Sequence, residues 1–330
     1  MPTRRGGLGT SDVLLLGAAG NSGALIGAEL AARGLSVRLA GRRLAPVDDL
    51  ARALTARGAS AQACAVDVDE PDSLSAALAG ARVVLNTVGP FTRRAGPVIA
   101  ACLAAGVPYV DIANEFPAVW GLLDRDGEAR ERGVVLVTGA GFGPAATETL
   151  VLRLVEVMAS PPRGVRVASA AGVTRQTEGV TQSIVAALGQ GALTYRDGRL
   201  VREPLGSGAT ELTFGGAARP VFPAPVGDLE AARRASGAAD VVAYQPDPST
   251  RRSGTDSVAW AEVTGRDGRI RTAELHLGEG VRATAAIAAE TTRRVLAGAM
   301  PGAWTPGRLF GADLVPDASG ARITLDGVPA

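Results

Sequence analysis

The sequence contains no lysine: all 34 basic residues of this 330-residue chain are arginine. This absence excludes a P-loop lysine, a Schiff-base lysine, a pyridoxal phosphate anchor and the Tyr-x-x-x-Lys pair of short-chain dehydrogenases. It also excludes any oxidoreductase whose general base is lysine. The accompanying richness in Ala, Arg, Gly and Pro is typical of a GC-rich genome, such as an actinobacterial one.

Cysteine, net charge and long apolar runs are also scarce. Cys64 and Cys102 are the only two cysteines, without a Cys-x-x-Cys motif, so we expect small buried side chains, no metal site and a reducing cytoplasm. The net charge of +1 offers no field that would hold nucleic acid or an anionic membrane surface. No segment approaches the ~18 apolar residues that cross a bilayer, and residues 1–10 lack the apolar region of a secretion signal.

Glycine is abundant by contrast, and its most informative cluster is the segment Gly17-Ala18-Ala19-Gly20-Asn21-Ser22-Gly23. This cluster follows the apolar run Val13–Leu16 and precedes an alanine-rich helical pattern, which is the order strand, turn, helix. Such a turn presents bare backbone N–H groups and a helix N-terminus to the pyrophosphate of a dinucleotide. We therefore predict that Gly17, Gly20, Asn21, Ser22 and Gly23 contact a cofactor; an ordinary strand-ending turn is the alternative.

The end of the second predicted strand indicates which dinucleotide is bound. Leu35–Ala40 is followed by Gly41-Arg42-Arg43, where an NAD-binding unit carries an acid for the ribose 2′-hydroxyl. Guanidinium groups suit a dianionic 2′-phosphate. The sequence therefore predicts NADP(H), with Gly41, Arg42 and Arg43 at the phosphate, unless these arginines only solvate a loop.

The first part of the chain alternates apolar strands with helical patterns such as Pro97–Ala105 and Ala118–Arg132. The predicted strands are Val13–Leu16, Ser36–Ala40, Ala63–Val66, Val83–Leu85, Tyr109–Ile112 and Val134–Val137. Continuous apolar strands separated by helices predict an α/β fold, a doubly wound parallel Rossmann sheet buried on both faces.

The alternation ends at the turn Gly139–Pro144, where we place a hinge. The later strands, Val165–Ala170, Ala209–Phe214, Asp240–Ala243, Ser257–Thr264 and Ile270–Leu277, predict a second α+β domain on a mixed or antiparallel sheet. We assign residues 1–140, with 281–330 returning, to the cofactor domain, and 141–280 to substrate binding and dimerisation. Residues 215–227 are read as a loop that closes over a substrate or simply lies on the surface.

Two further strand ends complete the predicted cofactor site. Asp67 and Val68 follow the third strand, where an adenine ring usually rests. The segment Thr87-Val88-Gly89-Pro90 follows the fourth strand, at the edge where doubly wound sheets bind ligands, and is expected to carry the nicotinamide ribose and phosphates. The alternative for this segment is a plain loop stop.

Several of these stretches together resemble the saccharopine dehydrogenase-like oxidoreductases, in particular the branch that includes trans-acting enoyl reductases. The stretches are the glycine turn, Ala40–Arg43, Leu85–Phe91, Ala105–Asp111 and Gly139–Pro144, with a faint later echo at Trp304–Pro306. The resemblance is dense over residues 12–150 and implies NAD(P)-linked hydride chemistry on a small molecule. It also implies that the second domain forms a substrate wall and contributes to a homodimer.

The chain departs from this family in two places. Asn114 stands where a glycine commonly precedes the glutamate, and Val173–Glu178 replaces a Gly-Thr-rich turn. If the resemblance holds there, Arg175 and Glu178 face the substrate pocket together with Phe91 and Phe142. These departures favour a specialised metabolite as the substrate.

Candidate proton donors for such a reduction are few. Asp111 and Glu115 lie near the end of the fifth strand, close to the crevice, with capping of the next helix as the alternative role. Tyr195 is expected in a loop. His276, the only histidine, lies in an apolar alternation where a packed strand residue is the alternative.

The sequence therefore predicts an NADP-dependent reductase of C=C, C=N or C=O bonds in a small specialised metabolite. The shortage of convincing proton donors keeps a redox-neutral cyclase or isomerase open. A non-catalytic protein that binds NADP(H) is the third possibility.

Overall fold

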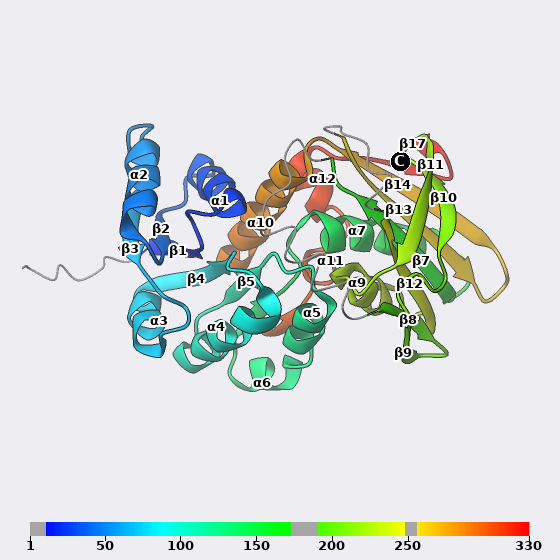
Figure 1. Ribbon diagram of the computed structural model, residues 1–330, viewed down its shortest axis with the longest axis horizontal. Helices are drawn as coiled ribbons and strands as arrows, with labels where there is room; N and C mark the ends of the chain where they lie inside the picture. Colours follow the sequence, from blue (N-terminus) through cyan, green and yellow to red (C-terminus); the bar gives the residue numbers. More distant parts are fainter. Residues whose placement is uncertain (1–10, 173–190, 248–255, 330) are drawn as a thin grey trace, which may run out of the picture.

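The computed structural model describes residues 11–172, 191–247 and 256–329, whose strands form a seven-stranded and a ten-stranded sheet (Figure 1). Arg175 and Glu178, two of the predicted substrate residues, lie outside the described residues. The two sheets lie toward opposite ends of the molecule in Figure 1, with α7 (Phe142–Val157) and α9 (Gly227–Ser236) between them.

The seven-stranded sheet is parallel in all its pairs and has the order β15-β6-β5-β4-β1-β2-β3. Its strands are β1 (Ser11–Leu16), β2 (Val37–Gly41), β3 (Ala61–Ala65), β4 (Ala81–Asn86), β5 (Tyr109–Asp111), β6 (Val135–Val137) and β15 (Gly302–Trp304). The order reverses at β1, because β2 and β4 lie on its two sides. This is the doubly wound arrangement that the alternating sequence predicts.

Side chains of β1 alternate between the two faces of this sheet. Val13 and Leu15 pack into a core with α1 (Asn21–Ala32), α2 (Leu44–Thr55) and α10 (Gly280–Ala297), which lie on the upper side in Figure 1. Leu14 and Leu16 pack into a second core below the sheet. The helices of that second face are α3 (Pro71–Leu78), α4 (Phe91–Ala105), α5 (Phe116–Leu123) and α6 (Asp126–Glu131). Burial on both faces explains why the strands are continuously apolar.

One predicted helix is divided. The pattern Ala118–Arg132 forms α5 and α6, which are separated near Arg125, a residue with φ −89° and ψ 15°. Asp126 and Glu128 occupy the first turn of α6, where carboxylates favour a new helix N-terminus. The apolar periodicity thus predicted a single helix over this segment, whereas its acidic residues favour the start of a second helix at Asp126.

The second sheet is mixed, and its order is β10-β11-β12-β7-β13-β14-β16-β17, with β8 and β9 attached to β12. Its strands are β7 (Pro162–Ala170), β8 (Ala192–Arg196), β9 (Arg199–Glu203), β10 (Thr210–Phe214), β11 (Ala217–Pro223), β12 (Asp240–Pro246), β13 (Ser257–Gly265), β14 (Ile270–Leu277), β16 (Arg322–Leu325) and β17 (Val328–Pro329). The predicted strands Ser257–Thr264 and Ile270–Leu277 are β13 and β14, which pair with each other as an antiparallel hairpin. The expected fold class, a parallel Rossmann sheet with a second mixed-sheet unit, is confirmed as well.

Two segments read as loops are strands. Tyr195 lies on β8, which pairs with β9 and β12. Residues 217–223 form β11, because Gly215 and Gly216, at φ 60° and 69°, make a tight hairpin turn after β10. The glycine and proline residues of this segment indicated a turn, and the strand that follows the turn was not predicted.

The chain crosses between the sheets more than once. Helix α10 packs on α1, and β15 then pairs with β6 to extend the first sheet. After α11 (Pro306–Phe310) and α12 (Leu314–Ser319), β16 pairs with β14 in the second sheet. The two sheets are therefore joined by segments that lie far apart in sequence.

Glu148 of α7 connects this returning segment to the centre of the molecule. Its carboxylate is fully buried and accepts hydrogen bonds from the Thr305 hydroxyl, from Gly307 N at 2.7 Å and from Arg308 N at 3.1 Å. Burial raises the pKa of Glu148 to about 7, while these hydrogen bonds and the nearby Arg308 guanidinium oppose the rise. These hydrogen bonds thus hold the Glu148 carboxyl at the start of α11, although burying its charged form costs free energy.

We expect Glu148→Gln to remove one component of the pH dependence of stability. Because the folded-state pKa is raised, the contribution of Glu148 is fully present below pH ~4.5 and is lost as the pH rises through about 7. Over that window, wild-type unfolding free energy should fall relative to the variant by on the order of 3 kcal/mol. Denaturant unfolding of both proteins from acid to neutral pH measures the difference; parallel curves would contradict it.

Candidate functional site

Two loops meet at the carboxyl ends of β1 and β4, where the strand order of the first sheet reverses. Thr87, directly after β4, donates from its N–H and its hydroxyl to the Leu16 carbonyl at the end of β1, at 3.0 and 2.8 Å. Residues 17–20 follow β1, and Thr87–Pro90 follow β4. Doubly wound sheets bind ligands in the crevice outside such a switch point.

The glycine turn after β1 has no room for side chains on its inner side. Gly17 has φ 80°, and a Cβ there would lie 2.6 Å from Thr87 Oγ1. A Cβ on Gly23 would overlap the Gly17 carbonyl oxygen and lie 2.9 Å from Ala18 Cα. Gly20 is exposed and precedes α1, which begins at Asn21. The turn thus presents the start of α1 to solvent with its backbone uncovered.

The predicted phosphate arginines lie on the same edge. Arg42 and Arg43 follow β2, are exposed, and form no ion pair with any residue in the described part of the chain. Arg43 is the residue before α2. An ideal Cβ on Gly41 would lie 4.0 Å from Ala19 Cβ, so this strand end and the glycine turn are neighbours.

Asp67 and Val68 occupy the next strand end. Val66 N donates to the Gly41 carbonyl at 3.1 Å, which places this segment beside the end of β2. Val68 is buried, and the Asp67 carboxylate accepts from Asp69 N at 3.0 Å. The Asp67 side chain therefore stabilises the turn in which it lies, next to the end of β2.

A buried relay of hydrogen bonds fixes the loop after β4. Val88 N donates to Asn86 Oδ1 at 2.9 Å, Asn86 Nδ2 donates to the Tyr109 hydroxyl at 3.1 Å, and that hydroxyl donates to Asp111 Oδ2 at 2.9 Å. The sequence did not reveal Asn86 and Tyr109 as parts of the site, because they meet only through the pairing of β4 with β5.

Asp111 is the end of this relay. Its other oxygen accepts from the Thr138 hydroxyl at 2.7 Å, from Ala113 N at 3.0 Å and from Gly139 N at 3.1 Å. Burial raises the pKa of Asp111 to about 6, and these hydrogen bonds oppose the rise. The carboxyl is surrounded by donors and connects the loop after β4 with the segment after β6.

Glu115 is buried beside the start of α4. It accepts from Phe91 N and from Asn114 N, both at 3.3 Å. Glu115 directly precedes α5, yet its side chain makes no cap for that helix. The carboxylate instead holds the first N–H of α4, immediately after Pro90.

Tyr195 and His276 belong to the second sheet. The buried Tyr195 hydroxyl donates to Glu230 Oε2 at 2.8 Å, and burial raises its pKa. His276 on β14 is exposed, with Nε2 3.1 Å from Glu274 Oε2, and lines a cavity of about 710 Å³ with Ser319 and Arg322. The structure does not bring either side chain together with Asp111 and Glu115.

The two predicted substrate phenylalanines are buried in separate cores. Phe91 is the first residue of α4 and packs in the core below the first sheet. Phe142 is the first residue of α7 and packs with α9 and the second sheet, while its N–H donates to Thr284 Oγ1 at 3.1 Å. Both rings are therefore covered by other core side chains.

The sequence did not indicate the segment 225–228, which pairs with residues 114–116 just before α5. Phe116 N donates to the Pro225 carbonyl at 3.1 Å, and Gly227 N donates to the Asn114 carbonyl at 2.7 Å. Asp228 follows and is 1% exposed. An acid in the first turn of a helix was the only local signal, and it is a common one.

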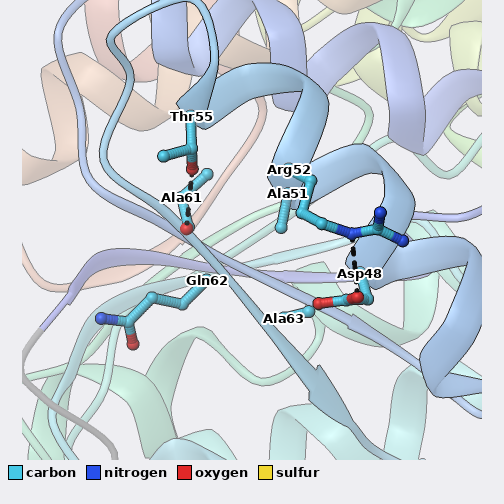
Figure 2. A pocket seen from close by; sticks show the side chains of 7 residues that line it. All are labelled: Asp48, Ala51, Arg52, Thr55, Ala61, Gln62 and Ala63. Carbon is cyan, nitrogen blue, oxygen red and sulfur yellow. Dashed lines mark hydrogen bonds and ion pairs between the residues drawn. The ribbon is translucent and has the colours of Figure 1, made fainter.

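A separate hollow of about 480 Å³ lies between α2 and β3 (Figure 2). Asp48 and Arg52 form an ion pair on one side of it, at 3.1 Å between Oδ2 and Nε, and Gln62 lies on the other side. This hollow contains none of the predicted site residues.

Two kinds of feature are absent from the described ranges. No three His, Cys, Asp or Glu side chains within them are grouped as metal ligands would be. No helix within them has both the length and the apolar composition of a membrane span.

Gly23→Ala should disrupt the turn, because the added Cβ would meet backbone atoms of Gly17 and Ala18. We expect a loss of NADP(H) binding of at least about tenfold and a lower melting temperature. Gly121→Ala is the matched control: it lies inside α5 with open space around it and no proline after it, so stability should be unchanged or slightly higher. Equal binding by both variants, measured by cofactor fluorescence, would argue against this role for the turn.

The first part of the chain is similar to known proteins. Residues 13–137 match the family model described as the saccharopine dehydrogenase NADP binding domain. A trans-acting enoyl reductase of Mycobacterium tuberculosis is 34% identical over 146 residues, covering 43% of this chain and 35% of that protein. The trans-acting enoyl reductase of Mycobacterium ulcerans is 36% identical over 137 residues, covering 40% of this chain and 32% of that protein. The match spans about a third of the length of these relatives.

The whole chain has the fold of a solved enzyme. The apo structure of saccharopine dehydrogenase (L-Glu forming) from Saccharomyces cerevisiae matches 96% of this chain and 99% of that one, with a TM-score of 0.69 and 15% identity. The resemblance read from the sequence is thereby confirmed. Residues 13–137 are thus similar to the saccharopine dehydrogenase NADP binding domain, and the described fold is that of the yeast structure.

Proposed function

We propose that this protein is an NADP-dependent oxidoreductase that reduces a C=C, C=N or C=O bond of a small specialised metabolite. The observation that carries the proposal is the meeting of two loops at the switch point of the first sheet, beside two exposed arginines that have no ion-pair partner among the described residues. The match of residues 13–137 to an NADP binding domain supports it. The glycine turn supplies the close backbone approach that a pyrophosphate requires.

The residues present fit NADP(H). Gly17, Gly20 and Gly23, with Asn21 and Ser22, form an uncovered helix start for the pyrophosphate. Arg42 and Arg43 offer guanidinium groups to the 2′-phosphate, and no acid stands there to repel it. Further roles follow from position, with Asp67 and Val68 beside the adenine and Thr87–Pro90 beside the nicotinamide half.

When bound, NADPH supplies a hydride, and the task of the protein is orientation. The relay through Asn86, Tyr109 and Asp111 fixes the N–H of Val88. Glu115 fixes the N–H of Phe91 at the other end of the same loop. The loop that would carry the nicotinamide half is thus held at both ends by buried groups, which limits its movement.

The substrate class is inferred from the names of similar proteins. The similar mycobacterial proteins are named trans-acting enoyl reductases, which supports an enoyl C=C among the three bonds. The domain division at residue 140, cytoplasmic location, specialised metabolism and homodimerisation stay predictions. Asp111, Glu115, Tyr195 and His276 also stay candidate catalytic residues; the donors around Asp111 favour a positioning role for it.

Replacing both Arg42 and Arg43 by Ala should weaken NADPH binding by about 1–3 kcal/mol, because charge-assisted hydrogen bonds to the 2′-phosphate are lost. NADH binding should be nearly unchanged. Arg57→Ala, an exposed arginine beyond the other end of α2, is the control and should alter neither affinity. Fluorescence titration of both cofactors decides it: tighter wild-type binding of NADH than NADPH would refute the assignment.

Turnover can be tested with a panel of a crotonyl thioester, a cyclic imine and a simple ketone, each with NADPH. We expect at least one compound to be reduced with loss of the reduced-nicotinamide absorbance. Product without an absorbance change would indicate the redox-neutral alternative. Tight NADPH binding without turnover of any compound would favour the cofactor-binding alternative.

A further inference from the structure

The side chain of Arg94 joins two loops at the carboxyl edge of the first sheet. Arg94 lies near the start of α4. Its Nη1 donates to the Gly89 carbonyl at 2.9 Å, in the loop after β4 (residues 87–90). Its Nη2 donates to Asp69 Oδ2 at 3.2 Å, in the loop after β3 (residues 66–70). One planar guanidinium group is therefore shared between two loops that follow different strands.

These two loops lie on either side of the predicted cofactor segments. In the strand order β4-β1-β2-β3, strands β1 and β2 stand between the other two. The glycine turn follows β1, and Arg42 and Arg43 follow β2. Because neighbouring strands lie ~4.8 Å apart, the ends of β4 and β3 are separated by about 14 Å. Arg94 thus connects the loops that flank the predicted sites of the pyrophosphate and the 2′-phosphate.

The two ends of this bridge differ in what holds them. The loop after β4 is already fixed on both sides of Gly89 by buried hydrogen-bond acceptors. In the loop after β3, Asp69 N donates to Asp67 Oδ1 at 3.0 Å, and Asp67 is the predicted neighbour of the adenine. Arg94 therefore attaches the segment beside the adenine to a loop that is held rigidly.

The surroundings of Arg94 indicate that the bridge adds little to the stability of the fold. The Arg94 side chain is 20% exposed and that of Asp69 is 52% exposed. An ion pair with an exposed partner contributes little to the free energy of unfolding. In addition, Arg94 Nε is buried and has no hydrogen-bond partner among the described residues, which costs free energy. The bridge is better explained by the two loops that it holds in place.

We propose that Arg94 is a positioning residue for the adenosine half of NADP(H), because it sets the separation of the two loops that flank that half. The inference rests on the proposed function. Loops that are ordered before binding lose less freedom when the ligand binds, which raises affinity. In this role Arg94 does not contact the 2′-phosphate. It therefore acts equally on NADPH and NADH, whereas Arg42 and Arg43 distinguish between them.

Calorimetric titration of the full chain tests this placement without turnover, with displacement of NADPH for the weaker ligands. Arg94→Ala should weaken NADPH and NADH by the same factor of about ten. Adenosine 2′,5′-bisphosphate, which lacks the nicotinamide half, should be weakened by a similar factor. Arg93→Ala, at the exposed neighbouring position of α4, is the control and should change NADPH affinity by less than about twofold.

Two results of this titration would contradict the placement. Unchanged binding of the bisphosphate by Arg94→Ala would mean that the bridge acts only on the nicotinamide half. A loss confined to NADPH would mean that Arg94 contacts the 2′-phosphate directly.

Further variants separate bridging from charge and from folding. Arg94→Lys keeps the charge but lacks the planar fork that reaches both partners, so its NADPH affinity should stay at least about fivefold below that of wild type. Asp69→Ala should weaken NADPH by about threefold alone and should add nothing to Arg94→Ala. The melting temperature of unliganded Arg94→Ala should fall by no more than about 3 °C. Full rescue by lysine, additive losses, or a larger fall in melting temperature would each overturn the bridging role.

The outcomes separate the two proposals. If wild-type protein binds NADPH and Arg94→Ala binds it equally well, the role of Arg94 is wrong while the proposed function stands. Wild-type protein that binds neither NADPH nor NADH overturns the proposed function, and the inference about Arg94 with it.

Discussion

The arrangement of the crevice depends on the close contact between the ends of β1 and β4. Thr87 bonds to the last carbonyl of β1, and Gly17 lies against the Thr87 side chain with no space for a Cβ. The Gly17 carbonyl also contacts Gly23, in the first turn of α1, too closely for a Cβ to fit there. Because interiors are close-packed, these contacts set the separation of the two loops and thereby the width of any site between them.

Buried acids are stabilised in two different ways in this protein. Glu230 and Glu290 each pair with two arginines, which lower the pKa of both carboxyls. Asp111, Glu148 and Asp228 are fully buried, and their partners are mainly hydroxyls and backbone N–H groups. Neutral donors compensate burial less completely than a guanidinium does, so the pKa values of these acids rise. The acids whose pKa values move toward neutrality are therefore the buried ones that have no arginine ion pair.

The fold and the cofactor side of the site could be predicted because their signals are local. A strand, a glycine turn and a helix are contiguous, and Arg42 and Arg43 directly follow their strand. The packing around Asn114 could not be predicted in the same way. Asn114, Gly143 and Asp228 come from three distant segments that meet only through the bridge of Glu115 with Val226 and the packing of α7 on α9. Tyr195 was misplaced for a related reason, since β8 is defined by its pairing with β9 and β12.

The position of β15 determines which fragments of the chain could fold alone. The first sheet is completed by residues 302–304, and α10 covers the upper face through Ala285, Ala288 and Ala289. A fragment ending at β6 would therefore leave a bare strand edge and an uncovered apolar surface, both of which promote aggregation. The segment that matches the family model, residues 13–137, is therefore shorter than the unit that folds, which also includes α10 and β15.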